Sequence, residues 1–184
     1  MSKVNVFFAE GFEEVEALTV VDMLRRAGID TDMVSVTGNK NVTGSHGISI
    51  VTDKMFEEIN DDADMLVLPG GMPGTINLKS HIGLCDMIKR FYGAKKFLAA
   101  ICAAPTVFGG MDMLKDRRAT CYPGMEDSLN CLEALEDAVV IDDYIITSRG
   151  LGTAIDFSLA LIGLLKDDVT ADNLASSIVY TVNK

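Results

Sequence analysis

The sequence predicts an α/β fold, an open α/β/α sandwich of three layers with a mostly parallel sheet between two layers of helices. Three observations support this fold class. Short, uninterrupted apolar runs, such as residues 65–68 and 96–101, have the length of strands that are buried on both faces. Amphipathic segments of helical length follow most of these runs. Strands and helices that alternate along a chain are typical of a parallel sheet covered by helices on both sides.

The first part of the chain begins with a strand–helix unit. Residues 4–9 are a short apolar run rich in β-formers, and the amphipathic segment after them ends at Gly28 with basic residues in its last turn. Residues 31–36 are the next expected strand. Residues 37–53 contain many Gly and Asn residues, which favour a hairpin or a pair of short edge strands.

The second part of the chain continues the alternation. The expected elements are a strand in 63–71 that ends at Pro-Gly-Gly, one long helix over 75–92, a strand over 95–101, a helix over 103–111, a strand near 117–123, a hairpin over 138–148, and helices over 153–166 and 170–182. Asp142 and Asp143 are the expected two-residue turn of the hairpin. No linker or internal repeat interrupts this order, so we expect residues 1–184 to form one domain.

Composition limits the classes of partner. Hydrophobic residues make up 48% of the chain and charged residues 23%, which is typical of a globular protein. The 27 acidic and 16 basic residues give a formal net charge of −11, which would repel a nucleic-acid backbone. The first apolar run is too short for a signal peptide, and no long apolar stretch follows it. We therefore expect a cytoplasmic protein with no nucleic-acid or membrane partner.

The cysteines and histidines do not have metal-ligand spacing. The chain has four cysteines without a C-x-x-C pair and two well-separated histidines, so we expect no bound metal and no other cofactor. In a reducing compartment these thiols stay free, and a cysteine with a function would act through its reactivity.

Three loops have unusual sequences and follow expected strands. They read "AEGFEEVE" after the first strand, "LPGGMPG" after the 65–68 strand and "ICAAP" after the 96–101 strand. Functional loops of open α/β sheets gather at the carboxyl ends of the parallel strands. We therefore expect these three loops to lie close together.

Cys102 lies in the third loop, at a predicted strand-to-helix turn. Ala103 and Ala104 are too small to obstruct the thiol, and Pro105 suits the first turn of a helix. The positive end of that helix would favour the thiolate, which is the nucleophilic form. The alternative is a buried cysteine that only fills space in the core.

The other two loops offer groups that could assist a nucleophile. Gly70 and Gly71 let the backbone approach closely and present amides to an oxyanion, although two glycines after a strand are often only a turn. Glu13, Glu14 and Glu16 crowd the entry to the first helix. Acids there commonly face water and complement the helix dipole. A carboxyl group buried beside a sulfur would instead keep its proton and donate it in a hydrogen bond to a thiolate.

The motifs together resemble one family. "GFEEVEA", "RRAGI", "LPGG", "AAICAAP" and "TSRGLGTAIDF" occur in the order and spacing of the ThiJ/PfpI superfamily, and the chain is similar to bacterial-type members of its DJ-one branch. The resemblance implies a flavodoxin-like fold and a nucleophile elbow that carries the reactive Cys102. It also implies that Glu16 is the protonated glutamate beside the sulfur, and that the amides of Gly71 and Ala103 form a small anion pocket.

The resemblance has further implications and two departures. Members of this branch form homodimers with the first helix at the interface, which would make Val15 a contact residue. Eukaryotic members have a histidine near the pocket, where "TCYP" here places Tyr122. His46 aligns near a position that often carries arginine and is expected at the pocket rim, or as a solvated loop histidine. His81 receives no role.

We consider two functions from different classes, the first of which is implied by the resemblance. The first is a cysteine-dependent, cofactor-independent glyoxalase or deglycase that acts on small reactive carbonyls, namely methylglyoxal-like α-oxoaldehydes or their early adducts, through the Cys102 thiolate and Glu16. The alternative is an oxidative-stress sensor or chaperone-like protein in which Cys102 is oxidised to the sulfinate. A PfpI-type cysteine peptidase is disfavoured because Ala103 occupies the position of the histidine that such members have next to the cysteine. A role in thiazole monophosphate biosynthesis lacks any nucleotide-binding motif.

Overall fold

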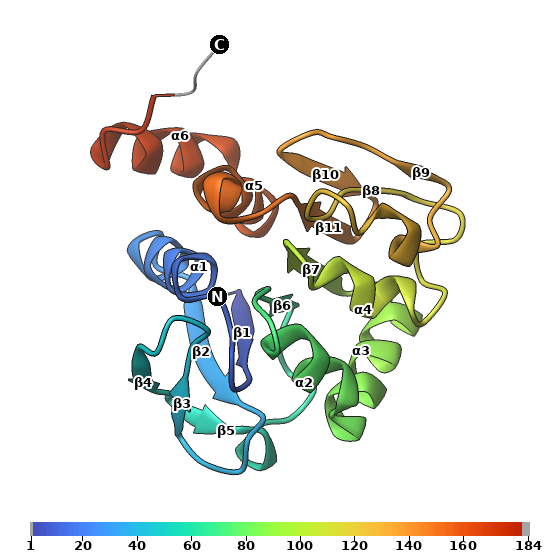
Figure 1. Cartoon of the computed structure of the whole chain (residues 1–184). Helices are drawn as coiled ribbons and strands as arrows, with labels where there is room; N and C mark the ends of the chain where they lie inside the picture. Colours follow the sequence, from blue (N-terminus) through green and yellow to red (C-terminus); the bar gives the residue numbers. More distant parts are fainter. Residues whose placement is uncertain (1, 182–184) are drawn as a thin grey trace.

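A computed structural model describes residues 2–181 and has the predicted three-layer α/β/α architecture (Figure 1). The central sheet has seven strands in the order β10-β11-β7-β6-β1-β2-β5. These strands are β1 (Lys3–Phe8), β2 (Asp30–Ser35), β5 (Lys54–Met55), β6 (Met65–Leu68), β7 (Phe97–Ile101), β10 (Val139–Asp142) and β11 (Ile145–Ser148). All neighbouring pairs are parallel except β10 and β11. The fold class is therefore confirmed.

Helices cover both faces of this sheet. The helices are α1 (Glu14–Arg26), α2 (Gly74–Ser80), α3 (Ile82–Gly93), α4 (Pro105–Gly109), α5 (Ala154–Leu165) and α6 (Asp168–Ser177). Figure 1 shows α1, α5 and α6 on one side of the sheet and α2, α3 and α4 on the other. Each group packs on its own apolar cluster. No helix among residues 2–181 combines the length and the apolar character that a membrane span requires.

The central strands are buried on both faces, which explains their uninterrupted apolar sequences. In β6, Leu66 and Leu68 point into the cluster beneath α2 to α4, whereas Met65 and Val67 point into the cluster beneath α1 and α5. All four side chains are fully buried. Because successive side chains of a strand point to opposite faces, a strand covered on both sides has no position that favours a polar residue.

Two small sheets lie outside the central one. β3 (Asn41–Thr43) and β4 (Ser49–Val51) form an antiparallel hairpin, which confirms the prediction for residues 37–53. β8 (Arg118–Ala119) and β9 (Glu133–Ala134) form a short parallel pair, so the strand predicted near 117–123 has only two residues. Three 3₁₀ turns, Phe56–Glu58, Glu126–Leu129 and Leu151–Thr153, complete the regular structure.

The prediction of one long helix over 75–92 is wrong, because His81 divides it into α2 and α3. The backbone of His81 is extended, with φ −81° and ψ 101°. Its Nδ1 accepts a hydrogen bond from the Leu84 amide at 3.0 Å, so the imidazole caps the start of α3. Side-chain oxygens are the usual helix caps, and a histidine at this position therefore did not predict the end of one helix and the start of another.

Other boundaries also differ from prediction. The helix predicted over 103–111 is the shorter α4. The turn of the 138–148 hairpin is Asp143-Tyr144 instead of Asp142-Asp143, because Asp142 still pairs with Ile145 at the end of β10. The Asp142 carboxylate accepts hydrogen bonds from the Arg118 amide and from the Arg117 guanidinium, at 3.0 and 3.1 Å.

The last helix begins and ends earlier than predicted. Asp167 caps α6 by accepting a hydrogen bond from the Thr170 amide at 2.7 Å, and the helix ends at Ser177. Residue 182, the end of the predicted helix, lies outside the described residues.

Candidate active site

Cys102 lies at a sharp turn between β7 and α4. Its amide donates to the Ser148 carbonyl at 2.9 Å, and its carbonyl accepts from the Tyr122 amide at 2.8 Å. Its φ of 64° is in the left-handed region, which residues other than glycine rarely adopt. These hydrogen bonds hold the residue in a strained conformation of the kind that clusters at functional sites. Pro105 begins α4, where a missing amide hydrogen has no cost.

The thiol of Cys102 opens into a cavity of about 430 Å³ with mostly apolar walls. The cavity is lined by Glu13, Ser45, His46, Gly71, Met72, Cys102, Ala103, Tyr122, Pro123 and Met125. All three loops singled out in the sequence contribute to this lining, because they follow the carboxyl ends of β1, β6 and β7. The other lining residues come from the β3–β4 hairpin and from residues 122–125. The alternative of a cysteine that only fills the core is wrong, because Cys102 is partly exposed to this cavity.

Glu16 lies behind the sulfur, in the first turn of α1. Its side chain is buried, with 1% of the residue exposed, and its Oε2 accepts a hydrogen bond from the Gly70 amide at 2.9 Å. A Cβ on Gly70 would lie 2.7 Å from both Glu16 Oε2 and the Cys102 Cβ. Gly70 therefore permits the carboxyl group and the cysteine to approach each other. The carboxyl group also forms a hydrogen bond with Cys102 that affects the pKa of both residues.

Burial raises the pKa of both groups, whereas the hydrogen bond between them lowers the pKa of Glu16 and raises that of Cys102. Burial, supported by the charge of Glu13, raises the pKa of Glu16 to about 7. Burial and then the Glu16 carboxylate raise the pKa of the Cys102 thiol to about 12, against the lowering effect of hydrogen bonds from the Ala103 and Gly71 amides. Two neighbouring buried anions are costly, so between these two pKa values the pair carries a single negative charge.

This result corrects one expectation from the sequence. The start of α4 does not by itself keep the sulfur ionised, because burial and the adjacent carboxylate oppose the thiolate more strongly than the amides favour it. The thiolate forms when the proton resides on Glu16, which then donates a hydrogen bond to the sulfur. The reactive form is therefore a property of the pair.

Glu13 and Glu14, at the entry to α1, are buried as well, so the expectation of solvated acids is wrong for them. Glu13 caps α1, with Oε2 accepting from the Glu16 amide at 2.7 Å. Glu14 accepts hydrogen bonds from the His46 amide at 2.8 Å and lies 2.9 Å from His46 Nδ1. Burial opposes the charge of Glu14, but these hydrogen bonds outweigh it and lower its pKa to about 2. Glu14 therefore stays ionised and fixes the loop that carries His46.

His46 and Tyr122 both line the cavity beside the thiol. The His46 side chain is 70% exposed, and its hydrogen bond with Glu14 raises the pKa of the imidazole. Tyr122 and Met72 are half exposed and form part of the apolar wall. Sequence reasoning did not identify Met72, Pro123, Met125 or Ser45 as cavity residues. Met72 follows the Gly-Gly turn directly, but only the folded topology brings residues 123 and 125 to the thiol.

The remaining cysteines lack comparable surroundings. Cys121 is fully buried, and burial raises the pKa of its thiol to about 11. Burial also raises the pKa of Cys85 and of Cys131. None of the three lines the cavity around Cys102. Position and neighbours therefore distinguish Cys102 from the other thiols.

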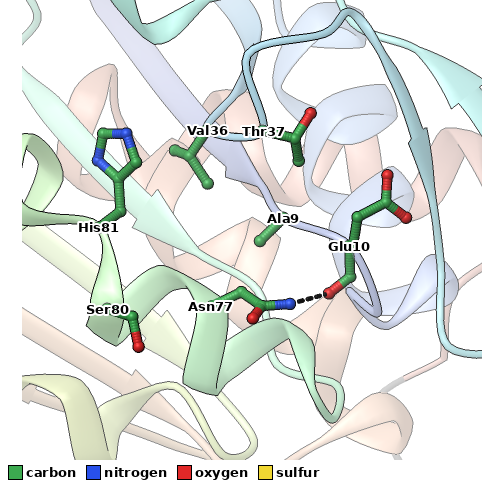
Figure 2. A pocket seen from close by; sticks show the side chains of 7 residues that line it. All are labelled: Ala9, Glu10, Val36, Thr37, Asn77, Ser80 and His81. Atoms are coloured by element: carbon green, nitrogen blue, oxygen red, sulfur yellow. Dashed lines mark hydrogen bonds between the residues drawn. The ribbon is translucent and has the colours of Figure 1, made fainter.

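A second cavity, of about 360 Å³, lies at the carboxyl ends of β1 and β2 (Figure 2). It is lined by Ala9, Glu10, Val36, Thr37, Asn77, Ser80 and His81. Asn77 bridges α2 and the end of β1 by donating to the Glu10 carbonyl at 2.8 Å. This cavity contains no thiol, and the imidazole on its wall caps α3. The cavity at Cys102 is therefore the better candidate for chemistry.

The fold and the site together define a class of protein. It is a flavodoxin-like α/β protein in which a cysteine on a strand-to-helix turn faces a buried carboxyl group and main-chain amides. The chain belongs to the DJ-1/PfpI family, whose model matches residues 2–164. Its relatives and structural neighbours place it in the DJ-1 branch of that family.

Three comparisons illustrate this membership. The chain is 39% identical over 184 residues to "Protein DJ-1 homolog B" of Arabidopsis thaliana, covering 98% of this chain and 42% of that protein. It is 31% identical over 168 residues to a protein of Pyrococcus abyssi named a deglycase, covering 89% and 99% of the two chains. The structure of "Toxoplasma gondii DJ-1, oxidized" matches with a TM-score of 0.95 at 33% identity, covering 99% of this chain and all 100% of that one. The chain thus spans less than half of the Arabidopsis relative.

Proposed function

We propose that the protein is a cysteine-dependent enzyme that converts methylglyoxal-like α-oxoaldehydes, or their early adducts, without a cofactor. The observation that carries this proposal is the Glu16–Cys102 pair, in which a carboxyl group with a pKa of about 7 contacts a thiol at the wall of a cavity. A group that titrates near neutral pH can both give and take a proton during a reaction. The Pyrococcus relative that is named a deglycase supports this class of activity.

The first step uses both members of the pair. With the proton on Glu16, the Cys102 thiolate adds to the aldehyde carbon, a carbon–sulfur bond forms, and the carbonyl electron pair moves to oxygen. The Gly71 and Ala103 amides, which face the sulfur, stabilise the developing oxyanion. Glu16 then gives its proton to that oxygen. The product is a hemithioacetal, and Glu16 is left as a carboxylate.

The second step is an isomerisation and needs no oxidant. The Glu16 carboxylate removes the proton from the former aldehyde carbon, the electron pair moves to the neighbouring ketone, and Glu16 gives this proton to the ketone oxygen to form an enediol. Glu16 then takes the hydroxyl proton of the sulfur-bearing carbon, whose carbonyl forms, and delivers a proton to the second carbon, which gives a 2-hydroxyacyl thioester on Cys102. Water then hydrolyses the thioester, releasing a 2-hydroxy acid and the free thiol. For methylglyoxal the product is lactate.

The test is the conversion of methylglyoxal to lactate by purified protein in the absence of glutathione. Cys102→Ala is expected to abolish turnover, because no other thiol lines the cavity. Cys85→Ala is the matched control, since Cys85 is also partly buried but lies outside the cavity. Turnover by Cys102→Ala equal to that of the wild type would overturn the proposal.

A redox sensor is the second candidate function, and the same pair favours it. Two successive reactions with peroxide would convert the Cys102 thiolate to the sulfenic and then the sulfinic acid, each transferring one oxygen atom and releasing water. The Glu16 proton and the nearby amides would stabilise the sulfinate. A DJ-1 structure described as oxidized is among the close structural neighbours. Mass spectrometry after graded peroxide is expected to find two added oxygen atoms on Cys102 and none on Cys85, Cys121 or Cys131.

We also propose a homodimer that uses α1. Val15 is 47% exposed, although its neighbours Glu14 and Glu16 are buried. Two residues of the β3–β4 hairpin are also apolar and exposed: Ile48, directly before β4, and Val51, at the end of β4. A second copy of the chain that covers Val15 would remove this apolar surface from water. The cytoplasmic location remains a prediction.

A further inference from the structure

Arg149 and Cys102 each directly follow the last residue of one of two adjacent strands, β11 and β7. β11 pairs with β7 so that Ser148 lies opposite Ile101, and the Cys102 amide donates to the Ser148 carbonyl. Arg149 follows Ser148 directly and therefore leaves the sheet at the same carboxyl edge as the thiol. The proposed function gives no role to this residue.

The guanidinium of Arg149 is the exception among the arginines. Arg25, Arg26, Arg90, Arg117 and Arg118 each form an ion pair with an aspartate. The Arg149 side chain forms none with residues 2–181, and its Nη1 is buried without a hydrogen-bond partner among them. Arg149 is partly buried, so one donor of a permanently charged group lies out of water without an acceptor, which is costly. A chain with a net charge of −11 has many carboxylates that could have paired with it.

Arg149 lines a cavity of about 280 Å³ that adjoins the thiol cavity. The other lining residues are Tyr122, Pro123, Gly150, Leu151, Gly152 and Thr153. Tyr122 and Pro123 belong to the walls of both cavities. The two cavities therefore share part of their walls, and Cys102 lines one of them and Arg149 the other.

Main-chain groups add to the positive character of this cavity. The amides of Leu151 and Gly152 donate to no other group in the described part of the chain. The 12-residue helix α5 begins directly after Thr153, so the positive end of its dipole is adjacent. A charged guanidinium, free amides and a helix N-terminus together favour an anion with several acceptor oxygens.

We propose that the cavity lined by Arg149 binds a small oxyanion, a carboxylate or a phosphate group, next to the active site. The planar guanidinium can donate two parallel hydrogen bonds to such a group, and the Leu151 and Gly152 amides can donate to the same oxygens. A cation is excluded by the arginine, and an apolar ligand would leave the guanidinium unpaired. The site requires no chemistry of the thiol, so it goes beyond the proposed function.

Nuclear magnetic resonance titrations test the proposal. Amide shifts of residues 150–153 are followed with acetate and with phosphate, at an ionic strength held constant with sodium chloride. Saturable shifts are expected in the wild type and in Arg90→Gln, an exposed arginine paired with Asp61. Binding is expected to be about tenfold or more weaker in Arg149→Gln, because a charge-assisted hydrogen bond is lost. Arg149→Lys keeps the positive charge but cannot donate two parallel hydrogen bonds, so it is expected to bind the anions with intermediate affinity.

The outcomes are separable. Saturation by phosphate alone, by acetate alone or by both supports the site and identifies the anion it takes. Shifts that do not saturate, or equal binding by the wild type and Arg149→Gln, overturn the proposal. If Arg149→Gln does not fold, wild-type affinity in Arg149→Lys for both anions overturns it equally. Cys102→Ala is expected to bind as the wild type does, so failure of the enzymatic proposal leaves this result unaffected.

Discussion

Glu16 Oε2 and the Cys102 Cβ both lie 2.7 Å from the point where a side chain on Gly70 would begin. The three residues follow β1, β6 and β7, which are neighbours in the sheet with β6 in the middle. The loop after β6 thus contributes Gly70, which has no side chain. The segments after β1 and β7 contribute the carboxyl group and the thiol, which approach each other in the space that a side chain on Gly70 would fill. Burial raises the pKa of both groups, and the adjacent Glu16 carboxylate raises that of the Cys102 thiol further.

The pH dependence of thiol reactivity should reveal the coupled pair. Below about pH 7 both groups hold their protons, and loss of one proton gives a single negative charge that Glu16 and Cys102 share. We expect the alkylation rate of Cys102 by iodoacetamide to rise with a midpoint near pH 7, level off, and rise again only toward pH 12. A single step at the ordinary thiol pKa, about 8.5, would contradict the coupling.

The buried Glu16 should also make stability depend on pH. Its pKa of about 7 in the folded protein lies above its ordinary value of 4.5, so the folded state binds this proton more tightly than the unfolded state does. The stabilisation is fully present below pH 4.5 and is lost as the pH rises through about 7. Relative to Glu16→Gln, which cannot titrate, the wild type should lose about 3 kcal/mol of unfolding free energy between pH 4.5 and pH 8.

Urea denaturation at both pH values measures this difference. The comparison with Glu16→Gln cancels the contributions of the other acids, because they are present in both proteins. An identical pH dependence of the two proteins would show that the carboxyl group titrates normally in the folded state.

Gly70 should not tolerate a methyl group. In Gly70→Ala the new Cβ would meet both Glu16 Oε2 and the Cys102 Cβ, and one of these groups must move. We expect a loss of about 1 to 3 kcal/mol of unfolding free energy and a large drop in turnover. Gly93→Ala is the matched control, since a Cβ there meets nothing within 4 Å. Wild-type activity in Gly70→Ala would show that the pair does not depend on this close contact.

The sequence predicted the layers of the fold and the three loops of the site, because both depend on short-range patterns. Buried strands such as β6 have no polar face, and Cys102 lies next to alanines and a proline that suit a sharp turn. The ionisation of the pair could not be predicted, since it depends on how deeply Glu16 is buried after α1 docks. The absence of an ion-pair partner for Arg149 among residues 2–181 could not be predicted either, because only the tertiary structure shows which carboxylates reach each arginine.

The exposed apolar residue on α1 should control self-association. If α1 forms the interface of a homodimer, Val15→Glu introduces a charge at the contact and should convert the dimer to a monomer. Val169→Glu on α6 is the matched control, because Val169 is also exposed, at 68%. Sedimentation velocity of the two variants and the wild type gives the oligomeric state. A wild-type monomer, or a Val15→Glu dimer of unchanged affinity, would exclude this interface.

The break between α2 and α3 should depend on the His81 side chain. His81 Nδ1 accepts the Leu84 amide at 3.0 Å, and His81→Ala leaves that amide without its protein partner. We expect a loss of about 1 kcal/mol of unfolding free energy, the usual effect of removing a helix cap. His81→Asn supplies a side-chain oxygen at the same position and should recover most of the loss. Equal destabilisation by Ala and Asn would mean that His81 stabilises the protein through its edge-on contact with Phe56 instead, whose ring centroid lies 4.7 Å from the imidazole.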